Sequence, residues 1–304
     1  TRPVEDMKLI AERVAQLDFS SEYSGHQEDE IGALGNSINT MSKRLEGAIR
    51  DLTEANRQLQ EDVKRERKID EMRKEFISSV SHELKTPIAL IQGYAEGLKL
   101  NVNEDEENRG FYCDVIIDEA ARMNRLVAQL LKLNQIESGY MKPSRVAFDI
   151  VDLVGKVVKK NGLSLEEHQM KLTVTGEPRL DVVADVDMVE QVLMNYVTNA
   201  INYAGGDGII NIDVSRVAGD GGAEAKVRVA VFNSGEPIPE EGLQSIWLPF
   251  YKADRARTRS IGGTGLGLSI VKAMQEAQGN ACGCENVDGG VAFWFDVDLA
   301  RADD

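Results

Sequence analysis

Cysteine is scarce in this sequence. Its three cysteines, Cys113, Cys282 and Cys284, are too few and too unevenly spaced for a disulfide framework. The pair Cys282 and Cys284 is only a weak signal for a metal site, because no other pair of ligands accompanies it. We expect three reduced thiols in the core of a cytosolic protein.

Long apolar stretches and positive charge are also in short supply. No apolar run approaches the roughly 18 to 20 residues that span a bilayer, so no segment of this sequence is expected to cross a membrane. Lys and Arg number 35 against 51 Asp and Glu, a formal net charge of -16, which repels nucleic acid and anionic membrane surfaces. We therefore expect no nucleic acid among its partners. The start at Thr1, without Met, indicates a fragment of a longer protein or a processed product.

The N-terminal part has the periodicity of helices, and 304 residues are enough for two or more domains. Two amphipathic patterns, at 4–17 and 31–45, flank a polar stretch at 18–29, which predicts helix, connector and helix. From Leu45 to Val63 the apolar steps of three and four predict a two-stranded coiled coil, in which Asn56 is a candidate for fixing the register.

The seven-residue frame is broken between Val63 and Ile69. The break either alters the supercoil at a point where a signal is transmitted, or reflects the loss of register that is common in charged amphipathic helices. The sequence favours neither interpretation.

The segment that follows contains His82, Glu83 and Thr86. Apolar positions recur there every three or four residues, as on one buried helical face. His82 lies about 200° from that stripe, at roughly 100° per residue, so its imidazole is expected to point outward. Thr86 shares the face of His82 one turn later, and Pro87 is expected to bend the helix. An isolated His-Glu pair is usually an ordinary solvated pair, but two nucleotide-binding signals downstream favour a phosphoacceptor.

A second helix is predicted from Glu106 to Glu137, antiparallel to the helix of His82. The two apolar faces are too wide for two helices to bury, so dimerisation into a four-helix bundle is the simple solution. After residue 144 strand and helix patterns are mixed without regular alternation, which favours an α+β sandwich of one mixed sheet covered by helices. Strands are expected at 145–150, 171–175, 209–214, 227–232 and 291–299, and helices at 151–160, 186–203 and 265–278.

Two features of this second half indicate a nucleotide. Asn195, Asn199 and Asn202 share one face of a predicted helix, where amide oxygens suit Mg²⁺; the alternative is a polar stripe facing solvent. The run from Gly262 to Gly267 lets backbone N–H groups approach an anion and leads into a helix. It is neither a Walker loop nor a dinucleotide-binding motif.

Taken together, five segments resemble, in order, the H, N, G1, F and G2 boxes of bacterial sensor histidine kinases. These segments are Ser81–Pro87, Asn195–Tyr203, Asn233–Pro237, Pro249–Tyr251 and Gly263–Gly267. The resemblance implies a multidomain chain. Its first domains are all-α, and its last domain is an α+β sandwich of the Hsp90, gyrase and histidine-kinase ATPase type. The same resemblance implies a HAMP-like helical linker at 1–50, a coiled-coil connector at 51–75, a dimerisation and histidine phosphotransfer domain at 64–140 and a catalytic ATP-binding domain at 145–301.

The resemblance also implies roles for matching residues. His82 would attack the γ-phosphate of ATP, Glu83 would act as general base, and Thr86 would orient a water for dephosphorylating the partner. Asn199 matches the Mg²⁺ ligand. The residues at nucleotide-binding positions are Asn195, Asn199, Tyr203, Asn233, Gly235, Lys252, Gly263, Thr264, Gly265, Leu266 and Gly267.

The implied activity is that of a homodimeric kinase, which uses ATP and Mg²⁺ to phosphorylate His82 and passes the phosphoryl group to an Asp of a response regulator receiver domain. Dephosphorylation of that regulator is a further implied activity. The implied location is the cytoplasmic portion of an inner- or cell-membrane receptor, with the membrane reached only through segments absent from this sequence.

Two residues depart from the family pattern. Asn233 stands where an Asp usually accepts a hydrogen bond from the adenine amino group, and the loss of charge could cost on the order of 1 kcal/mol. Asn202 stands where Lys is frequent. The alternative function is a non-catalytic dimeric scaffold, a pseudokinase with weakened nucleotide binding. A chaperone-like or topoisomerase-like ATPase is disfavoured, because it has no use for the His82 helix.

Overall fold

The computed structural model describes residues 2–25, 29–100, 106–217, 225–252 and 263–300. The chain divides into two compact units, Thr1–Glu75 and Phe76–Asp304. Within the described ranges, none of the helices has both the length and the apolar character needed to cross a bilayer.

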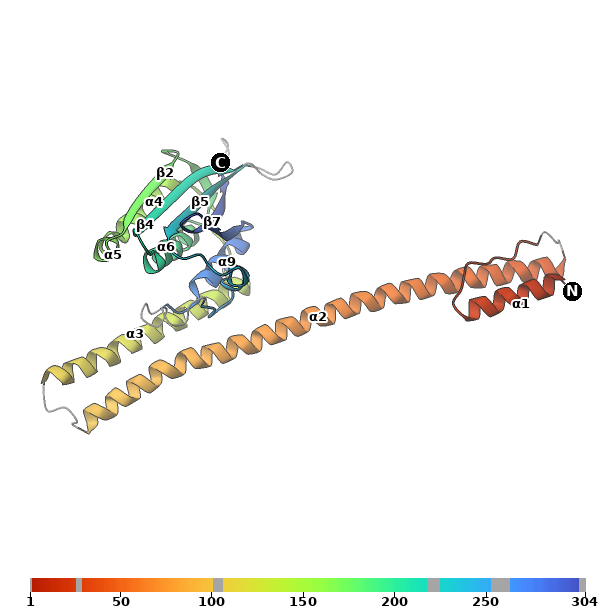
Figure 1. The fold of residues 1–304 in the computed structure, drawn as a ribbon, viewed down its shortest axis with the longest axis horizontal. Helices are drawn as coiled ribbons and strands as arrows, with labels where there is room; N and C mark the ends of the chain where they lie inside the picture. Colours follow the sequence, from red (N-terminus) through yellow and green to blue (C-terminus); the bar gives the residue numbers. More distant parts are fainter. Residues whose placement is uncertain (1, 26–28, 101–105, 218–224, 253–262, 301–304) are drawn as a thin grey trace. The chain divides into compact units, whose positions relative to one another are not determined.

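The N-terminal unit contains helix α1 (Arg2–Ala15) and the first part of helix α2 (Glu30–Lys99). Its small core is made by Met7, Ile10 and Val14 of α1 with Tyr23 of the connector. The connector is fixed to α2 because Asn39 accepts from the Tyr23 N–H at 2.8 Å and donates to the Tyr23 carbonyl at 2.9 Å. The predicted order of helix, connector and helix is confirmed (Figure 1).

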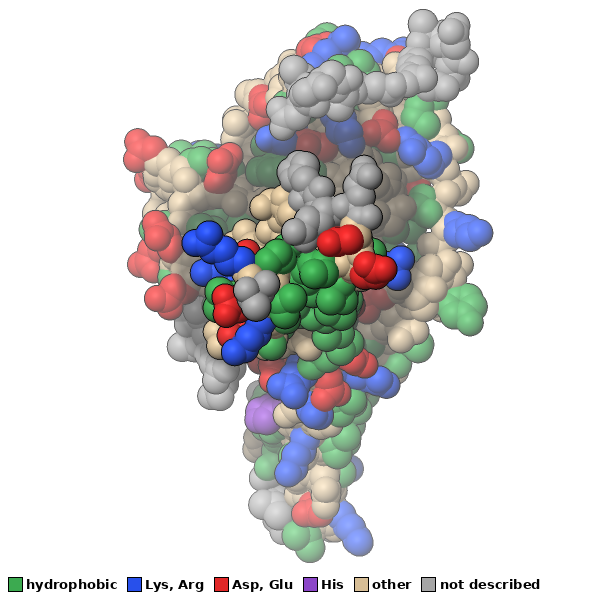
Figure 2. Space-filling view, turned by 90° about the vertical axis from the view of Figure 1, so that its right-hand side faces the viewer, with side chains coloured by type: hydrophobic (Ala, Val, Ile, Leu, Met, Phe, Trp, Pro, Cys, Tyr) green, Lys and Arg blue, Asp and Glu red, His purple; other side chains and the backbone are tan. Residues whose placement is uncertain are grey.

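Helix α2 runs without interruption through the predicted break in the heptad frame and through Pro87. Many of its apolar side chains stay exposed in a single chain, among them Leu34, Met41, Leu45, Leu52, Leu59, Val63, Ile69 and Met72. Figure 2 shows hydrophobic side chains at the surface among charged ones. These positions are the ones that a coiled coil would cover with a second copy.

In the second unit, the end of α2 is followed by helix α3 (Glu106–Glu137), with the bounds that the sequence predicts. The ring of Tyr94 packs edge-on against Tyr112, at 4.9 Å between centroids, and against Phe111 at 6.1 Å. Several apolar side chains of this hairpin are also exposed, namely Ile77, Ile88, Leu90, Phe111, Ile117, Val127 and Leu131.

The rest of the second unit is a seven-stranded mixed sheet with helices packed against it (Figure 1). The strands are β1 (Val146–Asp149), β2 (Lys171–Gly176), β3 (Asp181–Ala184), β4 (Ile209–Val217), β5 (Lys226–Ser234), β6 (Cys282–Val287) and β7 (Gly290–Leu299). Their order is β1-β3-β7-β5-β4-β2, with β6 also paired to β7; β2 and β4 are parallel and the other pairs antiparallel. The helices are α4 (Ile150–Lys160), α5 (Gly162–Glu167), α6 (Val186–Tyr203), α7 (Glu240–Ser245) and α9 (Gly267–Gln278).

The predicted α+β sandwich is confirmed, because burial alternates along the central strand β5 and the buried residues of α4, α6 and α9 share its core. Strands β3 and β6 and the short helices α5 and α7 are absent from the sequence-based expectation. β3 has only four residues, and β6 reads Cys-Gly-Cys-Glu, so neither carries a clear period-two pattern.

The cysteine expectation is wrong in part. Cys113 is exposed on α3, while Cys282 and Cys284 of β6 are half-buried. Burial is the main cause that raises the pKa of each β6 thiol to about 11, so both stay protonated at neutral pH.

An ion pair between β5 and β7 supports the face of the sheet around Trp294. The Arg228 guanidinium binds both carboxylate oxygens of Asp296, at 2.7 and 2.9 Å, and lies 3.7 Å from the Trp294 ring centroid. Arg228→Ala would leave the nearly buried Asp296 carboxylate unpaired, so we expect it to lower the free energy of unfolding by about 2 kcal/mol. Arg216→Ala, which breaks an exposed pair with Glu177, should cost less than about 0.5 kcal/mol. Equal losses in urea titrations of the two variants would contradict this.

Candidate functional site

The phosphoacceptor segment of α2 presents His82 to solvent. The His82 and Thr86 side chains are exposed, Glu83 is half-buried and Pro87 is buried. The Thr86 hydroxyl donates to the His82 backbone carbonyl at 3.4 Å. The expected outward position of His82 is therefore confirmed.

A different face of the same segment packs on the C-terminal domain. The Phe76 ring lies 5.7 Å from the Phe250 ring between centroids. Lys252 Nζ lies 3.2 Å from Glu83 Oε1, where it forms an ion pair and donates a hydrogen bond. Leu84 packs against the hydrophobic core of the second unit, which includes residues of α3. Two residues predicted for different steps, Glu83 and Lys252, are thus brought together.

The glycine run is fixed by contacts on both sides. Gly265 has φ +73°, and a Cβ there would lie 2.8 Å from the Phe250 Cα, so only glycine fits without a shift of the backbone. The Phe250 N–H donates to the Gly265 carbonyl at 2.9 Å. From α3, Gln129 Oε1 accepts from the Thr264 hydroxyl at 2.8 Å.

The start of α9 has no side-chain cap and adjoins α6. Gly267 begins the helix, the residue before it, Leu266, is buried, and no side chain of that residue caps the helix. A Cβ on Gly267 would lie 3.3 Å from Asn195 Oδ1. Asn195 Nδ2 is buried and has no hydrogen-bond partner within the described part of the chain. A free amide donor beside an uncapped helix N-terminus fits a phosphate group.

The asparagine stripe of α6 is not a solvent-facing one. Asn195, Asn199 and Asn202 are all half-buried, while the apolar face of the helix packs in the core. Asn199 lies one turn after Asn195, on the side of the helix that meets the start of α9. An amide oxygen at this place suits a magnesium ion that also binds phosphate.

A second group of predicted residues meets at the end of β5. Asn233 is only 4% exposed, and its Nδ2 donates to the Ser234 carbonyl at 3.3 Å. Gly235 has φ +150°, and a Cβ there would lie 3.2 Å from the Tyr203 carbonyl oxygen. The Ser234 hydroxyl donates to the Gly205 carbonyl at 2.7 Å, which holds this corner together.

The structure thus brings the predicted residues into two groups. Asn195, Gly265 and Gly267 surround the start of α9, and Tyr203, Asn233 and Gly235 surround the end of β5. Phe76 and Glu83 of α2 contact the domain through Phe250 and Lys252, while His82 is exposed. Sequence reasoning missed Gln129 and the pairing of Phe76 with Phe250, because nothing in a single sequence links residues so far apart along the chain.

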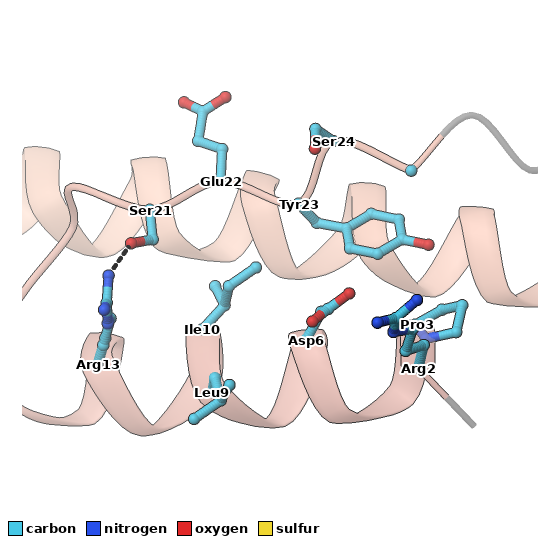
Figure 3. Close-up of a pocket in the computed structure, with 11 residues that line it drawn as sticks. Arg2, Pro3, Asp6, Leu9, Ile10, Arg13, Ser21, Glu22, Tyr23 and Ser24 are labelled. Atoms are coloured by element: carbon cyan, nitrogen blue, oxygen red, sulfur yellow. Dashed lines mark hydrogen bonds between the residues drawn. The ribbon is translucent and has the colours of Figure 1, made fainter.

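A cavity away from these two groups lies between α1 and the connector of the N-terminal unit (Figure 3). Its volume is about 500 Å³, and Arg13 closes one end by donating to the Ser21 hydroxyl at 2.6 Å. Arg2 and Arg13 face this cavity together with Asp6 and Glu22, so its charges cancel. None of the predicted site residues lines it.

Helix α9 of the C-terminal domain also packs against α3. Leu126, Leu133 and Ile136 of α3 are buried in the core of the unit, and Lys132 Nζ donates to Gln191 Oε1. At the end of this contact, burial and then the charge of Glu276 raise the pKa of Glu137.

The raised pKa of Glu137 predicts a pH-dependent penalty. A carboxyl with a raised pKa binds more protons in the folded state, so stability falls as the pH rises from its ordinary pKa of 4.5 through the raised value. Glu137→Gln should therefore raise the Tm at neutral pH, and the gain should disappear below pH 4.5, where both states are protonated. Thermal melts of wild type and variant across this range check it. An equal gain at both ends would contradict the assignment.

Three domain families match the chain, in an order that agrees with these groups of residues. Residues 1–47 match the HAMP domain, residues 72–139 the His Kinase A (phospho-acceptor) domain, and residues 184–301 the histidine kinase-, DNA gyrase B- and HSP90-like ATPase.

Curated relatives cover most of the chain. The sensor histidine kinase WalK of Bacillus subtilis is 33% identical over 230 residues, which are 75% of this chain and 37% of the relative. The sensor protein VanSB of Enterococcus faecalis is 30% identical over 272 residues, 89% of this chain and 58% of the relative. The chain therefore spans less than two thirds of the length of these relatives.

Among solved structures, the histidine kinase ThkA in complex with the response regulator protein TrrA is similar, with a TM-score of 0.60 and 29% identity. The similarity covers 74% of this chain and 61% of that one.

Proposed function

Because this chain belongs to the sensor histidine kinases, we propose that it is an ATP-dependent protein-histidine kinase that phosphorylates its own His82. The observation that carries this proposal is an exposed histidine on a helix packed against a domain with an anion site at the start of α9. Neither part alone points to this chemistry, since a surface His is ordinary and a helix N-terminus binds many anions.

The nucleotide would lie along the two groups of residues. Asn195 Nδ2 and the first N–H groups of α9 would bind phosphate oxygens, with Lys252 as a further cation. Asn233 Oδ1 would accept from the adenine amino group, because Nδ2 is already directed to the Ser234 carbonyl. Asn199 would hold Mg²⁺, which when bound neutralises charge on the phosphate groups.

The chain itself supplies the nucleophile and the base. A ring nitrogen of neutral His82 forms the new bond to the γ-phosphorus as the bond from that phosphorus to the ADP oxygen breaks. Glu83, the next residue, accepts the proton that the imidazole loses. Thr86, exposed one turn later, would orient water for dephosphorylating a phosphorylated regulator.

The proposed partners are a second copy of this chain and a response regulator. The exposed apolar residues of α2 and α3 fit a homodimer that buries them. The complex of ThkA with the response regulator TrrA supports a response regulator as a partner. We propose that this partner receives the phosphoryl group on an Asp. The HAMP match supports the cytoplasmic part of a membrane receptor as the location.

Incubation of the chain with Mg²⁺ and γ-labelled ATP tests the proposal. We expect covalent label that is lost in acid and stable in base, as phosphohistidine is. A chain that binds no ATP and takes up no label would instead favour the dimeric scaffold, for which Asn233 in place of Asp is the supporting observation.

A further inference from the structure

Two pairs of side chains join the phosphoacceptor helix to the C-terminal domain, and we name these two pairs the masking contact: Phe76 with Phe250, and Glu83 with Lys252. The rings lie 5.7 Å apart at an angle of 49°, and the charged atoms 3.2 Å apart. The Lys252 and Glu83 side chains are only 17% and 26% exposed. Water screens this pair less than it screens the pairs along α2 such as Arg57 with Glu54, which are 56% and 50% exposed.

The masking contact joins two groups that the proposed reaction needs separately. An ammonium group held against a carboxylate is less available to a phosphate, and a carboxylate that accepts a hydrogen bond from an ammonium group is less available to a histidine ring. We propose that the masking contact is a resting state that competes with nucleotide for Lys252, so that Glu83 becomes free to activate His82 only when phosphate takes the lysine. This inference rests on the proposed kinase function.

The orientation of α2 agrees with a resting state. Successive residues of a helix point about 100° apart, and the contact turns Phe76 and Glu83 toward the domain while His82 stays exposed to solvent. Of the residues that follow, Leu84 is half-buried and Pro87 is buried. The nucleophile is therefore exposed to solvent, while its neighbour Glu83 is bound to the domain that would hold the nucleotide.

Because the masking contact and the nucleotide compete for Lys252, formation of the contact and binding of the nucleotide are thermodynamically linked. If the masking contact weakens nucleotide binding by a given factor, nucleotide weakens the contact by the same factor. Loosening the contact from the side of α2 must then tighten nucleotide binding, although no residue of α2 has been assigned to the nucleotide site. A contact with only a structural role would have no such effect.

The test is the affinity of the full chain for Mg-ATP, measured by calorimetry. Glu83→Gln keeps the shape of the side chain and removes its charge, and we expect it to tighten binding about fivefold. Glu75→Gln, an exposed carboxylate on the same helix, removes the same charge away from Lys252 and should leave the affinity unchanged. Phe76→Ala, which keeps both charges, should tighten binding in the same direction, and serves if Glu83→Gln does not fold.

The gain in affinity for Mg-ATP should vanish when Lys252 is replaced. The double variant with Glu83→Gln and Lys252→Met should therefore bind Mg-ATP as Lys252→Met alone does. Equal affinities for wild type, Glu83→Gln and Phe76→Ala would overturn the competition while leaving the proposed kinase intact. Absence of binding in every variant would overturn both.

Discussion

His82→Gln should take up no acid-labile label from γ-labelled ATP, a loss of roughly 1,000-fold or more relative to wild type. Gln has no ring nitrogen to attack phosphorus, and neither neighbour can supply the same label, because an acyl phosphate on Glu83 would be lost in base and a phosphate ester on Thr86 would survive acid. Since His82 is exposed and makes no packing contact that the fold depends on, the variant should fold and bind Mg-ATP as wild type does.

The chain offers a matched control for this loss. His168 is also exposed, at the C-cap of α5, and one ring nitrogen lies 2.9 Å from the Ser164 carbonyl. His168→Gln should be labelled at the wild-type rate. The third histidine, His26, lies outside the described residues and is replaced in the same series. Label that persists in His82→Gln and disappears in either of the others would move the phosphoacceptor away from α2.

The sequence alone predicts most of the fold because each major element carries its own signal. The apolar steps of α3 give its bounds from Glu106 to Glu137, and the alternation along β5 identifies a strand with one buried face. The sequence does not predict β6, because β6 is an edge strand of small and polar residues. Its pairing with β7 holds it in place, rather than a pattern of its own.

The candidate site is predictable as a set of residues but not as an arrangement. Local rules place His82 outward and the glycine run at a helix start, since periodicity and backbone freedom act over a few residues. The ion pair of Glu83 with Lys252 joins positions 169 residues apart, and Gln129 and Thr264 lie 135 apart. Such contacts depend on how the domain packs on the hairpin, which no spacing in the sequence encodes.

Gly265→Ala should lower the affinity for Mg-ATP by at least about tenfold. The backbone of Gly265 has φ +73°, where a Cβ costs about 1 kcal/mol, and here that Cβ would also lie 2.8 Å from Cα and 3.0 Å from the carbonyl carbon of Phe250. These neighbours are backbone atoms, so relief requires the segments around Phe250 and Thr264 to move apart. That movement would displace Lys252 and the start of α9 together. Both belong to the proposed phosphate site.

Gly279→Ala separates the effect of backbone strain from that of the close approach to Phe250. Gly279 has the same φ of +73°, but a Cβ there would have no atom within 4 Å. It ends α9 in the left-handed conformation, so its replacement should cost about 1 kcal/mol of stability and leave the affinity for Mg-ATP unchanged. If the two variants lost the same stability and neither lost affinity, backbone strain alone would account for both. The close approach of Gly265 to Phe250 would then have no part in holding nucleotide.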